Sequence, residues 1–178
     1  MKNNTAIPIG IGSLFAIIVG LLPVILMMEI YLKIWGINSL ISGLQSFCSN
    51  PIDFLIVIAT GIILHELIHG LSWQLLAGKK ASAIKYGFDW KTLTPYAHCR
   101  ESMTVESYRL GTAMPGILLG LVPVISSIFT SNGWLFCFGI FFTFAAGGDL
   151  LILWLVRSLK AGTLVKDHPS KFGCYIIS

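Results

Sequence analysis

The sequence predicts an all-α membrane protein: four transmembrane helices, with a cytoplasmic β-hairpin between the second and third helices. Three observations predict this class. The 178 residues are 55% hydrophobic and 11% charged, whereas an ordinary soluble domain carries roughly 25% charged residues. Four apolar stretches are each long enough to cross a bilayer, which takes about 20 helical residues. Between two of these stretches, polar and apolar residues alternate in the pattern of a half-buried strand.

This composition excludes several classes of protein. A mean hydropathy of +0.82 rules out a disordered chain and argues against a soluble enzyme. The formal net charge is +4, but the basic residues are too few and too scattered to form a nucleic-acid-binding surface. The lipid bilayer is therefore the first expected partner of the chain, and nucleic acid is not expected to bind.

The apolar stretches leave no room for a separate soluble domain, so residues 1–178 are expected to form one integral membrane domain. Beyond the last stretch, residues 159–178 are expected to be a polar tail. Proline lies inside two of the stretches, and we expect a kink at Pro23 and another at Pro123. The four expected spans are residues 7–35, 52–77, 106–130 and 133–158.

The orientation of the chain follows from its basic residues. With four spans, both termini and the loop between the second and third spans lie on one side of the membrane. That side carries eleven of the twelve Lys and Arg residues, and the other side carries Lys33. Because Lys and Arg concentrate on the cytoplasmic side, both termini and this loop are expected to be cytoplasmic.

The loop between the second and third spans predicts a β-hairpin over about residues 82–101. Every second residue from Ile84 to Trp90 is large and apolar, which is typical of a strand with one buried face. A second extended run follows at 93–100, and Pro95 within it indicates an edge strand. We expect the hairpin to lie on the membrane face of the helices.

The second span contains the pattern H-E-x-x-H, formed by His65, Glu66 and His69. Residues four apart lie one turn apart on the same face of a helix, so the two imidazoles can converge on one zinc ion. Glu66 projects beside them, where it can hold the metal-bound water. Zinc lowers the pKa of that water to about 7, so Glu66 can act as a general base at neutral pH.

A catalytic zinc site needs a third protein ligand, and the sequence favours Asp149. Asp149 lies well inside the fourth span, at a depth compatible with His69 when both helices rise 1.5 Å per residue. The small residues at 145–148 should let the fourth span press against the second, and the glycines should permit local unwinding that aims the carboxylate. A lone acid paired with Arg or water is the alternative interpretation.

Three other ionisable residues are candidates for ligands or accessory groups. Glu29 lies near the outer end of the first span, where it is expected to snorkel or to pair with Lys33. His98, in the second strand of the hairpin, is an accessory candidate: a third ligand, a donor to the oxyanion or a solvated residue. His168 lies in the polar tail and is read as part of a turn or of a tail-docking element.

Several motifs together resemble a known family. They resemble intramembrane zinc metalloproteases of the site-2 protease type and, more closely, the small four-span membrane proteins called putative zincin peptidases. The resemblance implies that His65 and His69 bind zinc, that Glu66 is the catalytic base and that Asp149 completes the site. The matching motifs are residues 65–69, 94–99, 108–115, 148–150 and 167–169, with Gly173 after them.

The sequence therefore predicts a zinc-dependent endopeptidase that hydrolyses peptide bonds in or at the membrane, with a peptide or membrane protein as substrate. The first alternative is a non-enzymatic metal-binding regulator or scaffold, although a pure metal site has no need of Glu66. The second alternative is an ion transporter. A transporter would place ionisable residues at several depths along a path, whereas here they cluster at one depth.

Overall fold

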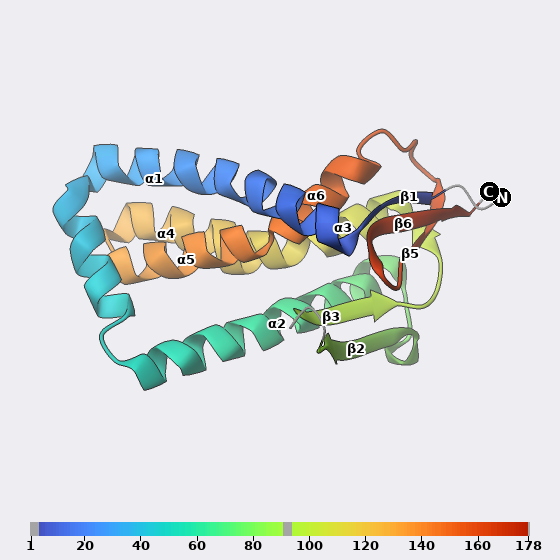
Figure 1. Cartoon of the computed structure of the whole chain (residues 1–178), viewed down its shortest axis with the longest axis horizontal. Helices are drawn as coiled ribbons and strands as arrows, with labels where there is room; N and C mark the ends of the chain where they lie inside the picture. Colours follow the sequence, from blue (N-terminus) through green and yellow to red (C-terminus); the bar gives the residue numbers. More distant parts are fainter. Residues whose placement is uncertain (1–3, 91–93, 178) are drawn as a thin grey trace.

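The computed structural model describes residues 4–90 and 94–177 and shows a mostly helical molecule, with its strands gathered at one end (Figure 1). Its helices are α1 (Ile9–Phe47), α2 (Pro51–Ala77), α3 (Val105–Pro115), the π-helical segment η2 (Gly116–Leu121), α4 (Val122–Thr130), α5 (Gly133–Ala145) and α6 (Gly147–Val156). A short 3-10 helix, η1 (Ala81–Ala83), leads from α2 into the first strand of the hairpin.

The strands form two separate antiparallel sheets. The predicted hairpin is present, because β2 and β3 pair from Ile84↔Cys99 to Asp89↔Thr94. The other sheet has the order β1-β6-β5-β4 and joins the two ends of the chain. The strands are β1 (Asn4–Pro8), β2 (Ile84–Asp89), β3 (Thr94–Cys99), β4 (Met103–Thr104), β5 (Leu164–Asp167) and β6 (Lys171–Ile177).

The four-stranded sheet corrects the prediction of an all-α protein with a polar tail. Residues 159–178 supply β5 and β6, and β6 pairs with β1 through contacts such as Thr5↔Cys174. At Gly173 the φ angle is 123°, and a Cβ atom there would collide with the backbone of Thr5. The pairing joins short segments from opposite ends of the chain, so no local pattern of hydrophobic residues predicts it.

Three segments are long and apolar enough to cross a membrane: Ile9–Phe47, Pro51–Ala77 and Val105–Thr130. α5 and α6 are bent by 48° and count as a fourth span if the pair crosses together. In the most apolar window of α1, 11% of the residues are buried inside the molecule. An apolar helix with so little of its surface covered by protein is typical of contact with lipid, so the helices indicate a membrane protein.

The two prolines that were expected to kink the helices behave differently. The backbone keeps helical angles through Pro23, and α1 instead breaks at Gly36, where φ is 74° and ψ is 174°. Before Pro123, η2 replaces the regular α-helical pattern. Proline cannot donate the usual backbone hydrogen bond, and a wider π-helical turn is one way to accommodate that loss.

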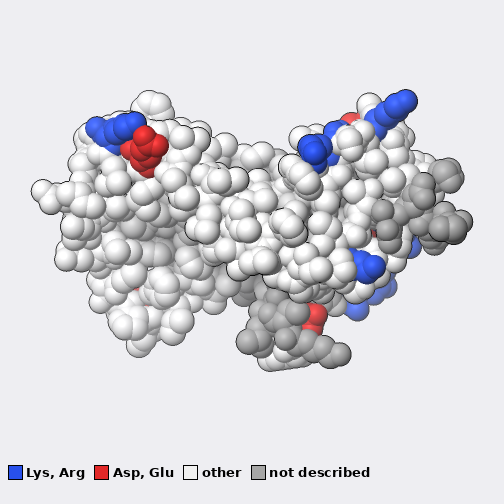
Figure 2. Space-filling view, turned by 45° about the horizontal axis from the view of Figure 1, so that its top comes forward, with Lys and Arg blue, Asp and Glu red and all other residues white. Residues whose placement is uncertain are grey.

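The charged residues agree with a membrane-embedded middle. On the face drawn in Figure 2, Lys and Arg side chains gather at the end that carries the strands, and a broad central band carries neither sign of charge. At the opposite end, Lys33 Nζ lies 2.6 Å from Glu29 Oε1, with both side chains more than half exposed. The predicted pairing of Glu29 with Lys33 is therefore confirmed.

Candidate metal centre

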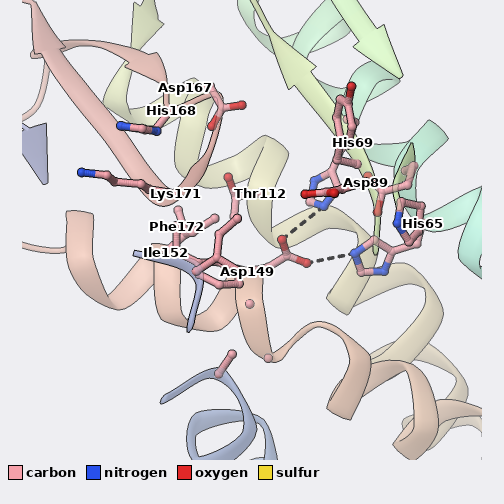
Figure 3. A pocket seen from close by; sticks show the side chains of 18 of the residues that line it. His65, His69, Asp89, Thr112, Asp149, Ile152, Asp167, His168, Lys171 and Phe172 are labelled. Atoms are coloured by element: carbon pink, nitrogen blue, oxygen red, sulfur yellow. Dashed lines mark hydrogen bonds and ion pairs between the residues drawn. The ribbon is translucent and has the colours of Figure 1, made fainter. Parts of the chain in front are cut away.

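Two imidazoles from α2 and one carboxylate from α6 meet near the end that carries the strands. His65 Nε2 lies 3.0 Å from Asp149 Oδ2, and His69 Nε2 lies 3.2 Å from Asp149 Oδ1 (Figure 3). One ligand atom from each residue lies within 4.8 Å of the other two, so this group could hold a metal ion. The structure thus brings together the three residues that the sequence predicted as ligands.

α2 presents both histidines because they lie one turn apart on its buried face. The exposed fraction is 9% for His65 and 6% for His69, and the ring centroids are 5.0 Å apart. One residue beyond His69, a Cβ atom on Gly70 would collide with the hydroxyl group of Tyr86. Glycine at this position therefore allows the β2–β3 hairpin to rest directly on the helix that carries the motif.

Asp149 reaches the histidines because the chain bends just before it. α5 ends at Ala145, and Asp149 lies in the first turn of α6. This break agrees with the expectation that the glycines interrupt the helix. The prediction that the small residues at 145–148 pack against α2 is wrong, however. A Cβ atom on Gly147 would collide with the backbone carbonyl of Ala16, so the close approach there is to α1 and not to α2.

The backbone of α3 orients one of the imidazoles. His69 Nδ1 lies 3.0 Å from the carbonyl oxygen of Gly111. A carbonyl only accepts, so Nδ1 carries the proton and donates it. In the neutral ring, Nε2 then directs a lone pair toward Asp149. Such a hydrogen bond from the far nitrogen is the usual way in which a protein fixes a metal-binding histidine.

The donor set fits zinc. Zinc takes imidazole nitrogen and carboxylate oxygen, and catalytic sites use three protein ligands with a fourth position open. Here His69 Nε2, unprotonated in the neutral ring, faces Asp149 Oδ1 across 3.2 Å, and a lone pair that faces a carboxylate so closely is repelled. A cation shared by the three atoms removes that repulsion, which makes a metal the natural occupant of the group.

Glu66 lies between the metal centre and the hairpin. Its side chain is half-buried and lines the same cavity as the three candidate ligands. The backbone of Ala97 in β3 lies beside this carboxylate. Glu66 is therefore beside the metal centre, as the H-E-x-x-H spacing predicted, and it touches the edge of a strand as well.

A cavity of about 880 Å³ opens onto this group. Its walls come from the start of α1, the hairpin, α3, the α5–α6 break and the turn between β5 and β6. Figure 3 shows Asp149 with His65 and His69 on one side, and Asp167 and His168 from the β5–β6 region on another. The cavity is large enough for several residues of an extended peptide, because small-molecule sites span about 300–1,000 Å³.

The accessory candidate His98 lies outside the metal group. Its Nδ1 atom lies 2.6 Å from Asp167 Oδ2, and 15% of its side chain is exposed. The interpretation of His98 as a solvated residue is therefore corrected: it is paired within the protein. The ligand group found among the described residues consists of His65, His69 and Asp149 and does not include His98.

The expectation that His168 forms part of a turn is confirmed. The backbone N–H of His168 donates to the carbonyl of Gly173 at 3.1 Å. Its Nδ1 atom accepts from the backbone N–H of Ser170, also at 3.1 Å. Burial and nearby Lys171 lower the pKa of His168, which agrees with a neutral ring that accepts at Nδ1. This turn closes one side of the cavity.

Sequence reasoning missed the role of two residues around the site. Asp167 accepts hydrogen bonds from Tyr108 and from His98. No sequence pattern in α3 or in residues 159–178 indicates that these residues are partners. The motifs at 108–115 and 167–169 contain both residues, so the motifs were a signal without an assigned role. Their partnership depends on the pairing of the chain ends, which is a tertiary feature.

Comparison with known proteins gives one match. A family model described as putative zincin peptidase matches residues 58–164, which is more than half of the chain. The matched segment includes the H-E-x-x-H motif and Asp149. No curated protein and no solved structure matches the chain. The match and the geometry of α2 agree, and the chain belongs to the family of putative zincin peptidases.

Proposed function

We propose that this protein is a zinc-dependent endopeptidase that cleaves peptide bonds within or at the membrane. The observation that carries the proposal is the meeting of His65, His69 and Asp149 beside Glu66, at a buried position among apolar helices. Membership of the family supports a metallopeptidase. We propose in addition that cleavage takes place within or at the membrane and that each residue has the role given below.

Each polar residue of the centre has a distinct role in the proposed reaction. His65, His69 and Asp149 would hold zinc, and bound zinc would supply Lewis-acid polarisation of the carbonyl and an acidified water. The carboxylate of Glu66 accepts the proton of the attacking water and delivers it to the nitrogen of the leaving amine. Gly111 acts through its carbonyl, which keeps the His69 proton on Nδ1.

The substrate must be extended at the site, because a helix hides its peptide bonds in its own hydrogen bonding. β3 offers the means to hold an extended chain. In the described part of its sheet, β3 pairs with β2 alone and leaves its other edge open. The backbone of Ala97 meets Glu66, and Pro95, Tyr96 and Ala97 line the cavity. A substrate added as a further strand would thus pass beside the base.

The proposed orientation places the termini and the hairpin in the cytoplasm. The support is the gathering of Lys and Arg at the end with the strands (Figure 2), since basic residues favour the cytoplasmic side. The cavity opens at the same end, so water would reach the centre from the cytoplasm. Reporter fusions on each loop test the orientation, and a hairpin that labels from outside the cell contradicts it.

The decisive experiment compares wild-type protein with Glu66→Gln in proteoliposomes. Zinc content is measured by elemental analysis, and cleavage is measured by mass spectrometry on a library of peptides that represent membrane segments. We expect Glu66→Gln to keep its zinc and to lose about 10²–10⁴-fold in cleavage rate, the usual contribution of a general base. Equal cleavage by both proteins contradicts the proposal.

The same preparation tests the two alternatives. A metal-binding regulator would carry zinc in both proteins, and neither protein would cleave any peptide. A transporter would move zinc across the vesicle wall, which an enclosed fluorescent indicator detects. We expect no zinc flux above that of empty vesicles.

A further inference from the structure

A second buried polar cluster lies on another wall of the cavity, and the proposed chemistry does not use it. Asp167, at the end of β5, is its centre. Asp167 Oδ2 accepts a hydrogen bond from His98 Nδ1 at 2.6 Å, and Asp167 Oδ1 accepts one from the Tyr108 hydroxyl at 2.9 Å. The Tyr108 hydroxyl also lies 3.2 Å from the carbonyl oxygen of Gly173. The cluster therefore joins β3, α3 and the β5–β6 pair.

Burial makes these hydrogen bonds strong constraints. The exposed fraction is 9% for Asp167 and 1% for Tyr108. Burial, reinforced by Asp167, raises the pKa of the neighbouring Cys174 thiol to about 11, so that neighbour stays neutral. A buried carboxylate that loses a partner is left with an unsatisfied charge, which costs more than an ordinary hydrogen bond. His98 is therefore held firmly in place.

Because His98 belongs to β3, its hydrogen bond to Asp167 also restrains the strand. Successive side chains of a strand point to opposite faces. Ala97 and Cys99 face the apolar core that contains Trp73 of α2, so His98 projects from the other face, toward Asp167. β3 thus contacts α2 through Ala97 and Cys99, and it is bonded to β5 through His98.

The open edge of β3 is the edge that matters to the metal centre. β2 occupies one edge through pairs such as Tyr86↔Ala97. Ala97 also meets Glu66 through its backbone. A shift of β3 along or away from α2 would change the distance between this edge and Glu66. The bond between His98 and Asp167 opposes such a shift.

We infer that Asp167 is a positioning residue: through its hydrogen bond to His98 it fixes the open edge of β3 beside Glu66, so that a substrate strand meets the metal centre in register. The role of Asp167 in docking the substrate rests on the proposed function. Its role in holding β3 is independent of that function and is tested separately.

The first test is hydrogen exchange on the full-length, zinc-loaded protein. In His98→Ala the amides of residues 96–99 should exchange about 10-fold faster than in wild type, the effect expected when a charge-assisted hydrogen bond is lost. The amides of α2 and the zinc content should stay unchanged. Tyr108→Phe is the matched control: it removes the other partner of Asp167, and exchange at 96–99 should stay within about 2-fold of wild type. Unchanged exchange in His98→Ala overturns the inference.

A rescue experiment separates positioning from general stability. Exchanging the two residues, as His98→Asp with Asp167→His, restores an imidazole–carboxylate pair. Protection of residues 96–99 should return to within about 3-fold of wild type in the double variant, although each single change removes it. If the double variant exchanges as fast as the single variants, the pair does not hold the strand.

The catalytic consequence is measured on peptides that wild-type protein cleaves in proteoliposomes. Asp167→Ala should raise KM about 10-fold and leave kcat within about 2-fold, because strand docking is weakened and the chemistry is untouched. Asp167→Asn keeps an acceptor for Tyr108 and a hydrogen-bonding partner for His98, and it should recover most of the loss. A fall in kcat alone contradicts the inference. If wild type cleaves nothing, the proposed function fails while the exchange result still decides whether Asp167 holds β3.

Discussion

Asp149 is half-buried and Asp167 is buried, and each carboxylate lies between two partners, yet the two clusters differ in what completes them. Asp149 faces the Nε2 atoms of two imidazoles at 3.0 and 3.2 Å. Asp167 faces one imidazole at 2.6 Å and one phenol at 2.9 Å. At Asp167 both partners have a proton to donate, so hydrogen bonds complete the cluster. At Asp149 the Nδ1 proton of His69 is donated to Gly111, so in the neutral ring that imidazole has no proton left for the carboxylate. The position of the protons, more than the residue types, distinguishes a metal site from a structural one.

The two clusters are joined through a single aromatic residue. The ring of Trp73 stacks on His69 with centroids 5.5 Å apart and on Tyr108 with centroids 6.3 Å apart. Trp73 Nε1 is buried and has no hydrogen-bond partner among the described residues. Its ring contacts Gly111 closely, the same residue whose carbonyl orients His69. A substitution that moves Trp73 should therefore affect both clusters, whereas a substitution within one cluster should affect that cluster alone.

The largest contrast is expected between the histidines of the two clusters. The double variant His65→Ala with His69→Ala leaves one of the three ligands, so zinc bound per protein should fall to below about 0.1. His98→Ala is the matched control and should bind as much zinc as wild type. Elemental analysis after dialysis measures both. Zinc loss in His98→Ala would place that residue in the metal centre and break the comparison.

The two aspartates should separate almost as clearly. Asp149→Ala removes one ligand, and the zinc dissociation constant should rise by about 100-fold or more. Asp167→Ala leaves all three ligands in place and should change zinc affinity by less than about 3-fold. Competition with a zinc chelator of known affinity measures both constants. Equal losses in the two variants would show that the clusters act as one unit.

Gly111→Ala tests the connection between the clusters. The added Cβ atom would collide with the ring of Trp73, and overpacking of this kind costs about 1–3 kcal/mol of stability. Because Trp73 stacks on His69, zinc affinity should also fall by about 10-fold. Gly10→Ala, where no neighbour lies within 4 Å of the new atom, is the control. If Gly111→Ala destabilises the protein but binds zinc normally, Trp73 does not transmit the disturbance.

The smallest effect on zinc binding is expected from Tyr108→Phe. The change removes one hydroxyl that donates to Asp167 and leaves the bond between Asp167 and His98. The free energy of unfolding should fall by about 1.5–3 kcal/mol, the value of a hydrogen bond to a charged group. Thermal unfolding in detergent, followed alongside zinc release, measures the effect. A loss of zinc in this variant would argue that the structural cluster supports the metal directly.

The features that the sequence predicted well are local or lie in register along one helix. The H-E-x-x-H spacing fixed the face shared by His65 and His69, and alternation of apolar residues located the hairpin. Depth along two helices was enough to select Asp149 over Glu29. Each of these inferences depends on a helix or strand repeat, which the order of residues contains directly.

The features that the sequence did not predict depend on distant parts of the chain. The sheet of β1, β6, β5 and β4 pairs the two ends of the chain, and the bond between His98 and Asp167 depends on that pairing. The break in α1 lies at Gly36 and not at Pro23; because proline is tolerated inside apolar helices when neighbours compensate, its position in the sequence does not locate a break. Short strands of four to seven residues carry too little pattern to show their partners.

The pairing of β1 with β6 has a consequence for how the protein is made. Synthesis proceeds from the N-terminus, so β1 must wait for residues 171–177 before its partner exists. By then all the apolar helices have been synthesised. We expect the wall of the cavity formed by β5 and β6 to be the last part of the site to assemble. If the protein is the peptidase proposed above, a nascent chain lacks a finished cleft while its helices insert, which would limit self-cleavage during synthesis.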